Sequence, residues 1–317
     1  MKIAILIVIA LILAAFVVVF MLTYGLYRYV FCHPLKKRPD PHGIPDSKLY
    51  RAYRDKMLKV VDDMEHTPYE EVSICSLDGC RLYGRWYEIK KNAPLVIFFH
   101  GYHGVADWDG YGFFKLCKKN GINILMPDQR AHGKSEGSAI TFGIRERYDC
   151  KLWTEYAAKR FGKSTDIFLA GVSMGAASVM MASELGLPEH VRAIIADCGY
   201  SEPASIIMET IRAMKLPVKL IYHLLRLGAR LFGHFDLEAA TALQAVQKSN
   251  IPILFIHGKQ DSIVPPSMVE ELYEGCKSKK ERVLIDGADH ANSAMTDYKT
   301  YEKAVLRFME QSLVEEK

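Results

Sequence analysis

The sequence lacks several features that would place it in particular classes of protein. Its 317 residues contain no internal repeat and no low-complexity tract, which excludes repeat architectures. The formal net charge is only +4 and the charges are scattered, so the composition does not indicate a nucleic-acid partner. The seven cysteines are odd in number and form no C-x-x-C pair, which argues against a disulfide scaffold and favours free thiols in a reducing compartment. A disulfide between Cys75 and Cys80, which flank the turn SLDG, stays open as an alternative.

The long apolar run of this chain lies at its N-terminus. Residues 3–22 contain no charge, no proline and no glycine, and a helix of that length spans about 30 Å, the thickness of a bilayer core. Tyr24, Tyr27 and Tyr29 follow the run, as an aromatic belt at a membrane interface would. A cleaved signal peptide is the alternative, but the run exceeds the usual maximum of about 15 residues and no small-x-small cleavage site follows it. We therefore expect residues 1–31 to form a single-pass membrane anchor.

The basic residues around this run predict its orientation. Lys2 and the α-amino group precede it, whereas Arg28 and the cluster Lys36-Lys37-Arg38 follow it. The positive-inside rule then places the large C-terminal part in the cytoplasm. The cluster itself suits anionic lipid headgroups.

The remainder of the chain divides into a linker region and a larger domain. Residues 32–68 begin with four clustered prolines and continue as a short charged helix around 47–64. The segment 32–46 could reach about 50 Å if fully extended, so it would act as a tether. From residue 69 to residue 317, an antiparallel hairpin is predicted first, and short apolar runs then alternate with amphipathic stretches. The apolar runs cover 95–99, 122–127, 167–171, 191–197, 251–258 and 282–286.

This alternation predicts an α/β fold, with a mostly parallel eight-stranded sheet covered by helices on both faces. One interval, residues 199–247, contains apolar helical stretches and no strand. We expect it to be a helical insertion that caps the ends of the strands. Its bulky apolar side chains favour a lid over an apolar substrate site, although most of them must also pack onto the core.

Residues 171–175 read GVSMG, a G-x-S-x-G motif centred on Ser173. Chance alone would give such a match with odds of about one in twelve, so the surroundings decide its meaning. Here an apolar run ends at the motif and a helical stretch begins after it. A sharp strand-to-helix turn would expose the Ser173 hydroxyl above the N-terminus of the helix, where a developing oxyanion is favoured. The context therefore predicts a nucleophile.

A nucleophilic serine needs a base and a carboxylate that orients the base. Asp261 follows one late apolar run, and His290 follows the next. In an open α/β sheet both would lie beside Ser173 at the carboxyl ends of the strands. His290 would then act as the base and Asp261 would hold its tautomer. Asp197, at the end of another run, is the rival carboxylate.

The oxyanion hole requires two backbone N–H donors. The N–H of Met174, directly after the nucleophile, is the first candidate. The second is the N–H of Tyr102, because Gly101 lets the backbone approach the substrate. His100 and His103 form an H-x-x-H pair nearby, but no third ligand is spaced to complete a metal site, so we expect no metal and no cofactor.

The motifs HGYHG, DQRAHGKSEG, GVSMGAAS, HGKQDSIVP and GADHANS occur in the order and spacing of one family. With them, residues 69–315 resemble the α/β-hydrolase superfamily. Within it, the chain resembles bacterial membrane-anchored serine hydrolases of the prolyl-oligopeptidase and lysophospholipase branches. The resemblance implies a carboxylesterase, thioesterase or lysophospholipase, and it assigns the nucleophile to Ser173, the acid to Asp261 and the base to His290.

Three functions therefore remain open at this point. The first is hydrolysis of carboxylic esters or thioesters, with small or lipid-like acyl substrates, through an acyl-enzyme on Ser173. The second is a serine exopeptidase, although residues 23–68 are too short for the extra domain that the prolyl-oligopeptidase branch usually carries. The third is a catalytically silent hydrolase fold that serves as a binding protein. The sequence does not indicate an oligomeric state.

Overall fold

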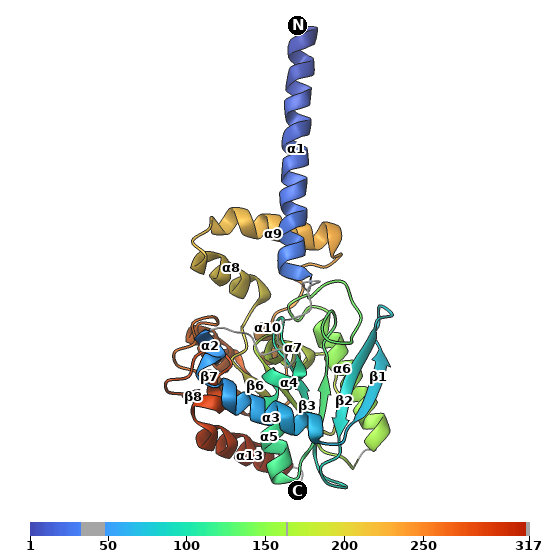
Figure 1. Ribbon diagram of the computed structural model, residues 1–317, viewed down its shortest axis with the longest axis vertical. Coiled ribbons are helices and arrows are strands. Elements are labelled where there is room, and N and C mark those ends of the chain that lie inside the picture. The colour runs from blue at the N-terminus through green and yellow to red at the C-terminus, as the bar shows by residue number, and fades with distance from the viewer. Residues whose placement is uncertain (33–47, 163, 315–317) are drawn as a thin grey trace.

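The computed structural model describes residues 1–32, 48–162 and 164–314 (Figure 1). The proline-rich linker and the Lys36-Lys37-Arg38 cluster lie outside the described residues. All seven cysteines are free, including Cys75 and Cys80.

The prediction of an eight-stranded, mostly parallel sheet is confirmed. The strand order is β1-β2-β4-β3-β5-β6-β7-β8, and the pairs β1–β2 and β2–β4 are antiparallel while the others are parallel. The strands are β1 (Glu70–Cys75), β2 (Arg81–Tyr87), β3 (Leu95–Phe99), β4 (Asn123–Pro127), β5 (Ile167–Val172), β6 (Val191–Asp197), β7 (Ile253–Gly258) and β8 (Lys280–Ile285). The central strands are buried along their whole length because helices cover both faces, which explains why their sequences are apolar without alternation.

The helices form two layers, one on each face of the sheet (Figure 1). Alternate residues of β3 belong to different cores: Leu95, Ile97 and Phe99 pack in one, and Val96 and Phe98 in the other. The first core is covered by α6 (Glu146–Phe161), α7 (Met174–Ala182), α10 (Ala242–Val246) and α11 (Pro266–Gly275). The second is covered by α2 (Lys48–Arg51), α3 (Arg54–His66), α4 (Ala106–Asp109), α5 (Tyr111–Asn120), α12 (Ser293–Thr296) and α13 (Tyr298–Val314).

The interval between β6 and β7 contains three helices. Of these, α10 packs against α7 beside the sheet, whereas α8 (Pro203–Ala213) and α9 (Val218–Phe232) pack against each other. Figure 1 shows α8 and α9 standing beyond the sheet, on the side from which the N-terminal helix leaves. The bulky side chains of this pair divide into two sets, because Ile207 and Leu225 are buried while Leu220 and Leu231 are exposed.

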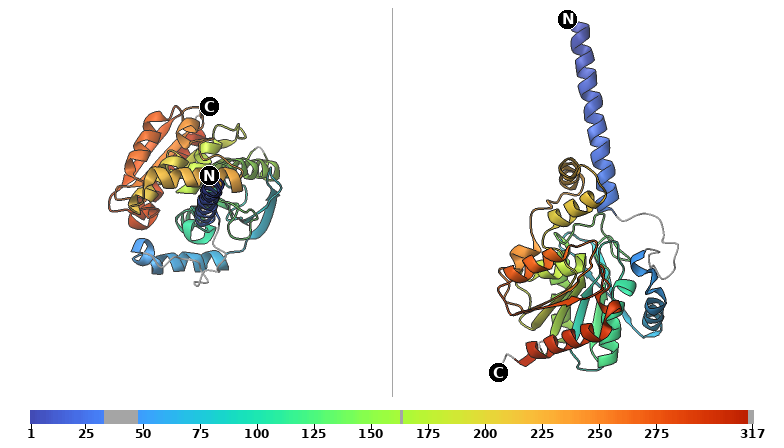
Figure 2. Two further views of the ribbon diagram at one scale, coloured as in Figure 1. Left: turned by 90° about the horizontal axis from the view of Figure 1, so that it is seen from above. Right: turned by 90° about the vertical axis from the view of Figure 1, so that its left-hand side faces the viewer.

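The N-terminal helix α1 (Lys2–Phe31) projects from the domain and is long and apolar enough to cross a membrane (Figure 2). Its last turns nevertheless belong to the domain. Thr23, Tyr27 and Phe31 are buried, and their spacing of four residues places them on one face of the helix. The carbonyl oxygen of Phe31 accepts a hydrogen bond from the N–H of Ile140 at 2.7 Å.

This packing joins α1 to the domain directly, in addition to the tether expected from residues 32–46. The ring centroid of Phe31 lies 5.9 Å from that of Phe142 and 5.3 Å from that of Phe235. At the crossing of α1 and α9, a Cβ atom on Gly228 would lie 3.0 Å from the Cβ atom of Tyr27. Side-chain packing in the last turns of α1 therefore holds this helix against the domain.

Replacing Phe31 by Ala should destabilise the whole domain. The side chain is fully buried between two aromatic rings, and truncation of a buried Phe typically costs about 3–5 kcal/mol. Phe16→Ala, in the exposed part of the same helix, is the matched control and should change the stability little. The measurement is thermal unfolding of the full chain in one detergent. Equal melting temperatures for the two variants would contradict the assignment of Phe31 to the domain core.

Candidate active site

Ser173 occupies a strained turn between β5 and α7. Its backbone has φ 53° and ψ −117°, a region that side chains larger than glycine rarely adopt. Steric hindrance explains why both flanking positions of the motif are glycine. A Cβ atom on Gly171 would collide with the backbone of Gly175, and one on Gly175 would collide with the carbonyl oxygen of Phe99. The G-x-S-x-G sequence thus lets the chain turn sharply between strand and helix with the serine at its apex.

The structure brings together the three side chains predicted as a triad. Nε2 of His290 lies 2.9 Å from Oγ of Ser173, and Nδ1 of His290 lies 2.8 Å from Oδ2 of Asp261. A carboxylate accepts hydrogen bonds, so Nδ1 donates to Asp261, and the lone pair of Nε2 is left to accept the Ser173 hydroxyl. This is the arrangement that general-base activation of a serine requires.

Asp261 is held as an anion by the groups around it. Its Oδ1 accepts hydrogen bonds from the N–H groups of Ile263 at 2.9 Å and Val264 at 2.8 Å. Its Oδ2 accepts from His290 and lies 3.2 Å from Nε2 of His257. Burial would raise the pKa of Asp261, but the hydrogen bonds from His257 and His290 outweigh it and hold that pKa below its usual value.

His257 is a neighbour of the site that sequence reasoning missed. It lies on β7, four residues before Asp261, and its side chain is fully buried. Its Nε2 also lies 2.9 Å from the carbonyl oxygen of Val264. Burial lowers the pKa of His257, but contact with the Asp261 carboxylate more than compensates and raises it overall. The signal available in the sequence was weak, since a histidine inside an apolar strand indicates only a buried polar group.

Asp197, the rival carboxylate, has a different partner. Its Oδ1 accepts a hydrogen bond from the hydroxyl of Ser293 at 2.9 Å, and its carbonyl oxygen accepts the N–H of Ser173 at 2.9 Å. Burial raises the pKa of Asp197 to about 6. The imidazole of His290 thus contacts the carboxylate of Asp261. Asp197 instead contacts the turn, because its carbonyl oxygen accepts the N–H of Ser173.

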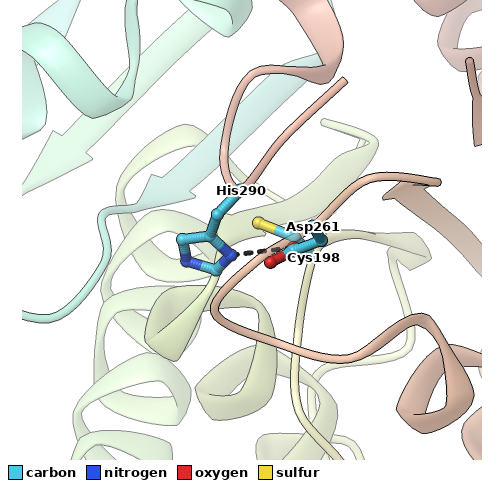
Figure 3. A group of neighbouring side chains, drawn as sticks. All are labelled: Cys198, Asp261 and His290. Atoms are coloured by element: carbon cyan, nitrogen blue, oxygen red, sulfur yellow. Dashed lines mark hydrogen bonds and ion pairs between the residues drawn. The ribbon is translucent and has the colours of Figure 1, made fainter. Parts of the chain in front are cut away.

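Cys198 lies close to Asp261 and His290, and Figure 3 shows the three side chains together. A metal ion would require free ligand atoms and a thiolate. Burial, with the nearby carboxylates of Asp197 and Asp261, raises the pKa of the Cys198 thiol well above its usual value. Both oxygens of Asp261 already accept hydrogen bonds. The chemistry of this cluster therefore fits a serine–histidine relay better than a metal site.

The loop after β3 carries Tyr102, the expected second oxyanion donor. Its backbone is fixed on both sides, because the N–H of Gly101 donates to Oδ2 of Asp109 at 2.6 Å and the N–H of His103 donates to Nε2 of His132 at 3.1 Å. The hydroxyl of Tyr102 donates to the carbonyl oxygen of Val30 in α1 at 2.8 Å. The loop is thereby joined to the last turn of the N-terminal helix.

The two expected donors are the N–H groups of Tyr102 and Met174. Neither makes a backbone hydrogen bond among residues 1–32, 48–162 and 164–314. For Met174 this follows from its place as the first residue of α7, where the N–H has no partner within the helix.

Hydrogen bonds join the histidine pair in the loop after β3 to the loop DQRAHGKSEG after β4. Nε2 of His100 accepts the N–H of Gln129 at 3.0 Å, so it is occupied by the fold. Arg130 is buried and pairs with Asp149 at 2.6 Å and with Asp78 at 2.9 Å. Asp149 and Asp78 were not identified from the sequence, because nothing in their local pattern indicates a partner so far along the chain.

Comparison with known proteins assigns the chain to a family. The family described as "Serine aminopeptidase, S33" matches residues 90–235 and 215–293. The chain belongs to this family. The predicted resemblance to the α/β-hydrolase superfamily is thereby confirmed, and the membership supports hydrolase activity.

Individual proteins agree with the family. The uncharacterized protein YqkD of Bacillus subtilis is 27% identical over 60% of this chain, which spans 63% of that protein's own length. The lysophosphatidylserine lipase ABHD12 of Danio rerio is 25% identical over 60% of this chain and 49% of its own. Among solved structures, the Pyrococcus furiosus esterase Pf2001 is 25% identical, with a TM-score of 0.62 over 79% of this chain and 94% of its own.

A pair of substitutions separates the two carboxylates. Asp261→Asn should lower kcat by about 10⁴-fold, because an amide favours the wrong tautomer of His290. Asp197→Asn keeps the size of a side chain that hydrogen-bonds Ser293, and it should change kcat far less. Steady-state hydrolysis of a p-nitrophenyl ester by the full chain in detergent provides the comparison. The reverse ranking of the two variants would move the acid to β6.

Proposed function

We propose that this protein is a membrane-anchored serine hydrolase that cleaves carboxylic ester or thioester bonds through an acyl-enzyme on Ser173. The observation that carries the proposal is the continuous contact from Ser173 through His290 to Asp261. The N–H groups of Tyr102 and Met174 are the proposed oxyanion hole. The anchor is α1, whose apolar length suffices to cross a bilayer.

The reaction follows from this geometry. Oγ of Ser173 attacks the carbonyl carbon of the substrate while its proton passes to Nε2 of His290. The negative charge then develops on the carbonyl oxygen, facing the two N–H donors. When the bond to the leaving group breaks, His290 returns the proton to the leaving oxygen or sulfur. Water repeats the sequence on the acyl-serine, which releases the acid and restores the Ser173 hydroxyl.

Asp261 contributes through charge. During both steps His290 is transiently an imidazolium, and a buried positive charge is stabilised by an adjacent anion. The hydrogen bonds that Asp261 receives from Ile263 and Val264 keep it ionised and fix its orientation. His257, on the other side of Oδ2, limits how far the carboxylate can rotate.

The names of similar proteins favour esters over peptides. Pf2001 is named as an esterase and ABHD12 as a lysophosphatidylserine lipase. The family description favours a second candidate, an aminopeptidase. The two candidates share the triad and differ in the leaving group, so substrate preference separates them. A catalytically silent protein is disfavoured because no member of the triad is missing or turned away.

Ser173→Ala should abolish ester hydrolysis, by about 10⁶-fold in kcat, and should also abolish labelling by a fluorophosphonate probe. The substitution removes one half-buried oxygen and leaves the turn intact, so thermal stability should be retained. Ser178→Ala, one helical turn further along α7, is the matched control and should label normally, because its hydroxyl bonds only the carbonyl oxygen of Met174. Undiminished labelling of Ser173→Ala would refute the proposed mechanism.

The acyl preference should extend beyond acetate. Each buried methylene contributes about 0.8 kcal/mol, or about fourfold in kcat/KM, until the acyl site is filled. The measurement is a p-nitrophenyl ester series from acetate to palmitate, with the full chain in detergent, because the last turn of α1 belongs to the domain. A sharp maximum at acetate would refute a lipid-like substrate. Cleavage of aminoacyl arylamides with poor ester turnover would favour the aminopeptidase.

A further inference from the structure

Helix α9 carries a stripe of exposed leucines that the domain does not cover. Leu220, Leu227 and Leu231 are 59%, 42% and 51% exposed. Their spacing of seven and then four residues puts them on one face of the helix. Met214 and Leu216, in the turn before α9, are also exposed. Other large apolar side chains exposed in the described chain outside α1 are scattered singly, so this stripe is unusual.

The rest of the α9 surface is accounted for by the domain. Tyr222, Leu225 and Ala229 are buried on its inner side. A third side is basic, and there Arg226 and Arg230 form ion pairs with Asp236 and Glu238. The helix therefore has one face packed on protein, one face held by ion pairs and one apolar face that no part of the described chain covers.

The position of α1 indicates which environment surrounds the exposed apolar face of α9. Figures 1 and 2 show α9 running across α1 and not along it. The crossing is close, since a Cβ atom on Gly228 would lie 3.1 Å from the carbonyl oxygen of Thr23. The ring of Phe232 lies 5.4 Å from that of Phe20 and 5.1 Å from that of Tyr24. The apolar run of α1 ends at Leu22, so α9 crosses α1 where that helix would leave the hydrocarbon core.

We propose that α9 lies in the plane of the membrane interface, with Leu220, Leu227 and Leu231 in contact with lipid acyl chains. An amphipathic helix with one apolar face beside a charged face is suited to such a position. The exposed leucine stripe continues the apolar surface of α1, so a bilayer that surrounds α1 reaches the stripe without rearrangement of the domain. A second copy of the chain is a less fitting occupant, because the same bilayer would already occupy the space beside α1.

The consequence for catalysis rests on the function proposed above. Phe31, at the end of α1, packs against Phe142, and the ring of Phe142 lies 5.0 Å from that of Tyr102. Tyr102 also donates its hydroxyl to Val30. The lipid-facing unit made of α1 and α9 thus borders the proposed oxyanion loop. An acyl substrate held in the bilayer beside α1 would therefore enter the site next to this loop.

Tryptophan fluorescence can test the position of α9. The three native tryptophans, Trp86, Trp108 and Trp153, are buried, so an added exposed tryptophan reports on its own surroundings. We would place Leu227→Trp, Phe16→Trp and Leu313→Trp separately in the full chain, in vesicles of phosphatidylcholine brominated along the acyl chains. Phe16 is in the projecting part of α1, and Leu313 is near the C-terminus, at the end of the molecule opposite α1 (Figure 1).

The proposal expects the emission added by Leu227→Trp, taken as the difference from the wild-type protein, to fall by about half in brominated vesicles, since an interfacial helix buries its apolar face about 5–10 Å into the headgroup region. Phe16→Trp should be quenched at least as strongly, and Leu313→Trp should be unaffected. Quenching of Phe16→Trp without quenching of Leu227→Trp would overturn the interfacial position of α9 and leave the anchor standing. Absence of quenching at Phe16→Trp would overturn both.

Activity offers a second measurement that keeps this proposal separate from the catalytic one. The double variant Leu220→Glu, Leu227→Glu should lose about tenfold in kcat/KM on a long-chain ester embedded in vesicles, because charge opposes contact with lipid. Its turnover of a water-soluble ester and its labelling by a fluorophosphonate should match the wild-type protein. Leu313→Glu is the control. An equal loss on both substrates would refute the lipid-contact role, and failure of wild-type labelling would refute the hydrolase.

Discussion

The turn at Ser173 is the constraint on which the site depends. A serine at φ 53° is stable only if the surrounding chain holds it, and here β5 and α7 hold it from both sides. Because Gly171 and Gly175 have no side chain, α7 can begin directly over the end of β3, against Phe99. That close approach places the positive end of α7 and the loop after β3 beside the same hydroxyl. A looser turn would separate the nucleophile from both proposed oxyanion donors.

The surroundings of two buried carboxylates beside this turn shift their pKa values in opposite directions. Asp261 accepts hydrogen bonds from two backbone N–H groups and contacts two histidines, and these donors outweigh the cost of burial, so its pKa falls. Asp197 receives one hydroxyl donor, burial dominates, and its pKa rises to about 6. The difference matters for catalysis, since an orienting acid must be ionised when His290 becomes positive. It also explains why two aspartates at strand ends can differ in role.

The sequence alone was sufficient for the fold and for the choice of candidate residues, because both are encoded locally. Buried parallel strands are apolar runs, and Ser173, Asp261 and His290 each lie in the turn or loop that follows one of them. What could not be predicted depends on contacts between distant segments. The periodicity of the sequence does not reveal such contacts. Examples are the approach of His257 to Asp261, the pairing of Arg130 with Asp149, and the packing of Phe31 between Phe142 and Phe235.

The outward sector of α9 is another feature that depends on contacts between distant segments. Helix α9 has two apolar sectors, one facing the domain and one facing outward. Both consist of bulky apolar residues, so the sequence of residues 218–232 does not tell which sector is buried. Only the direction of α1, fixed by the close contact at Gly228, distinguishes them. An apolar residue on the outer sector packs against nothing in the described domain, and this exposure fits the proposed contact with lipid. The outer leucines Leu220, Leu227 and Leu231 point away from the domain, on the side where the proposed bilayer around α1 would meet them.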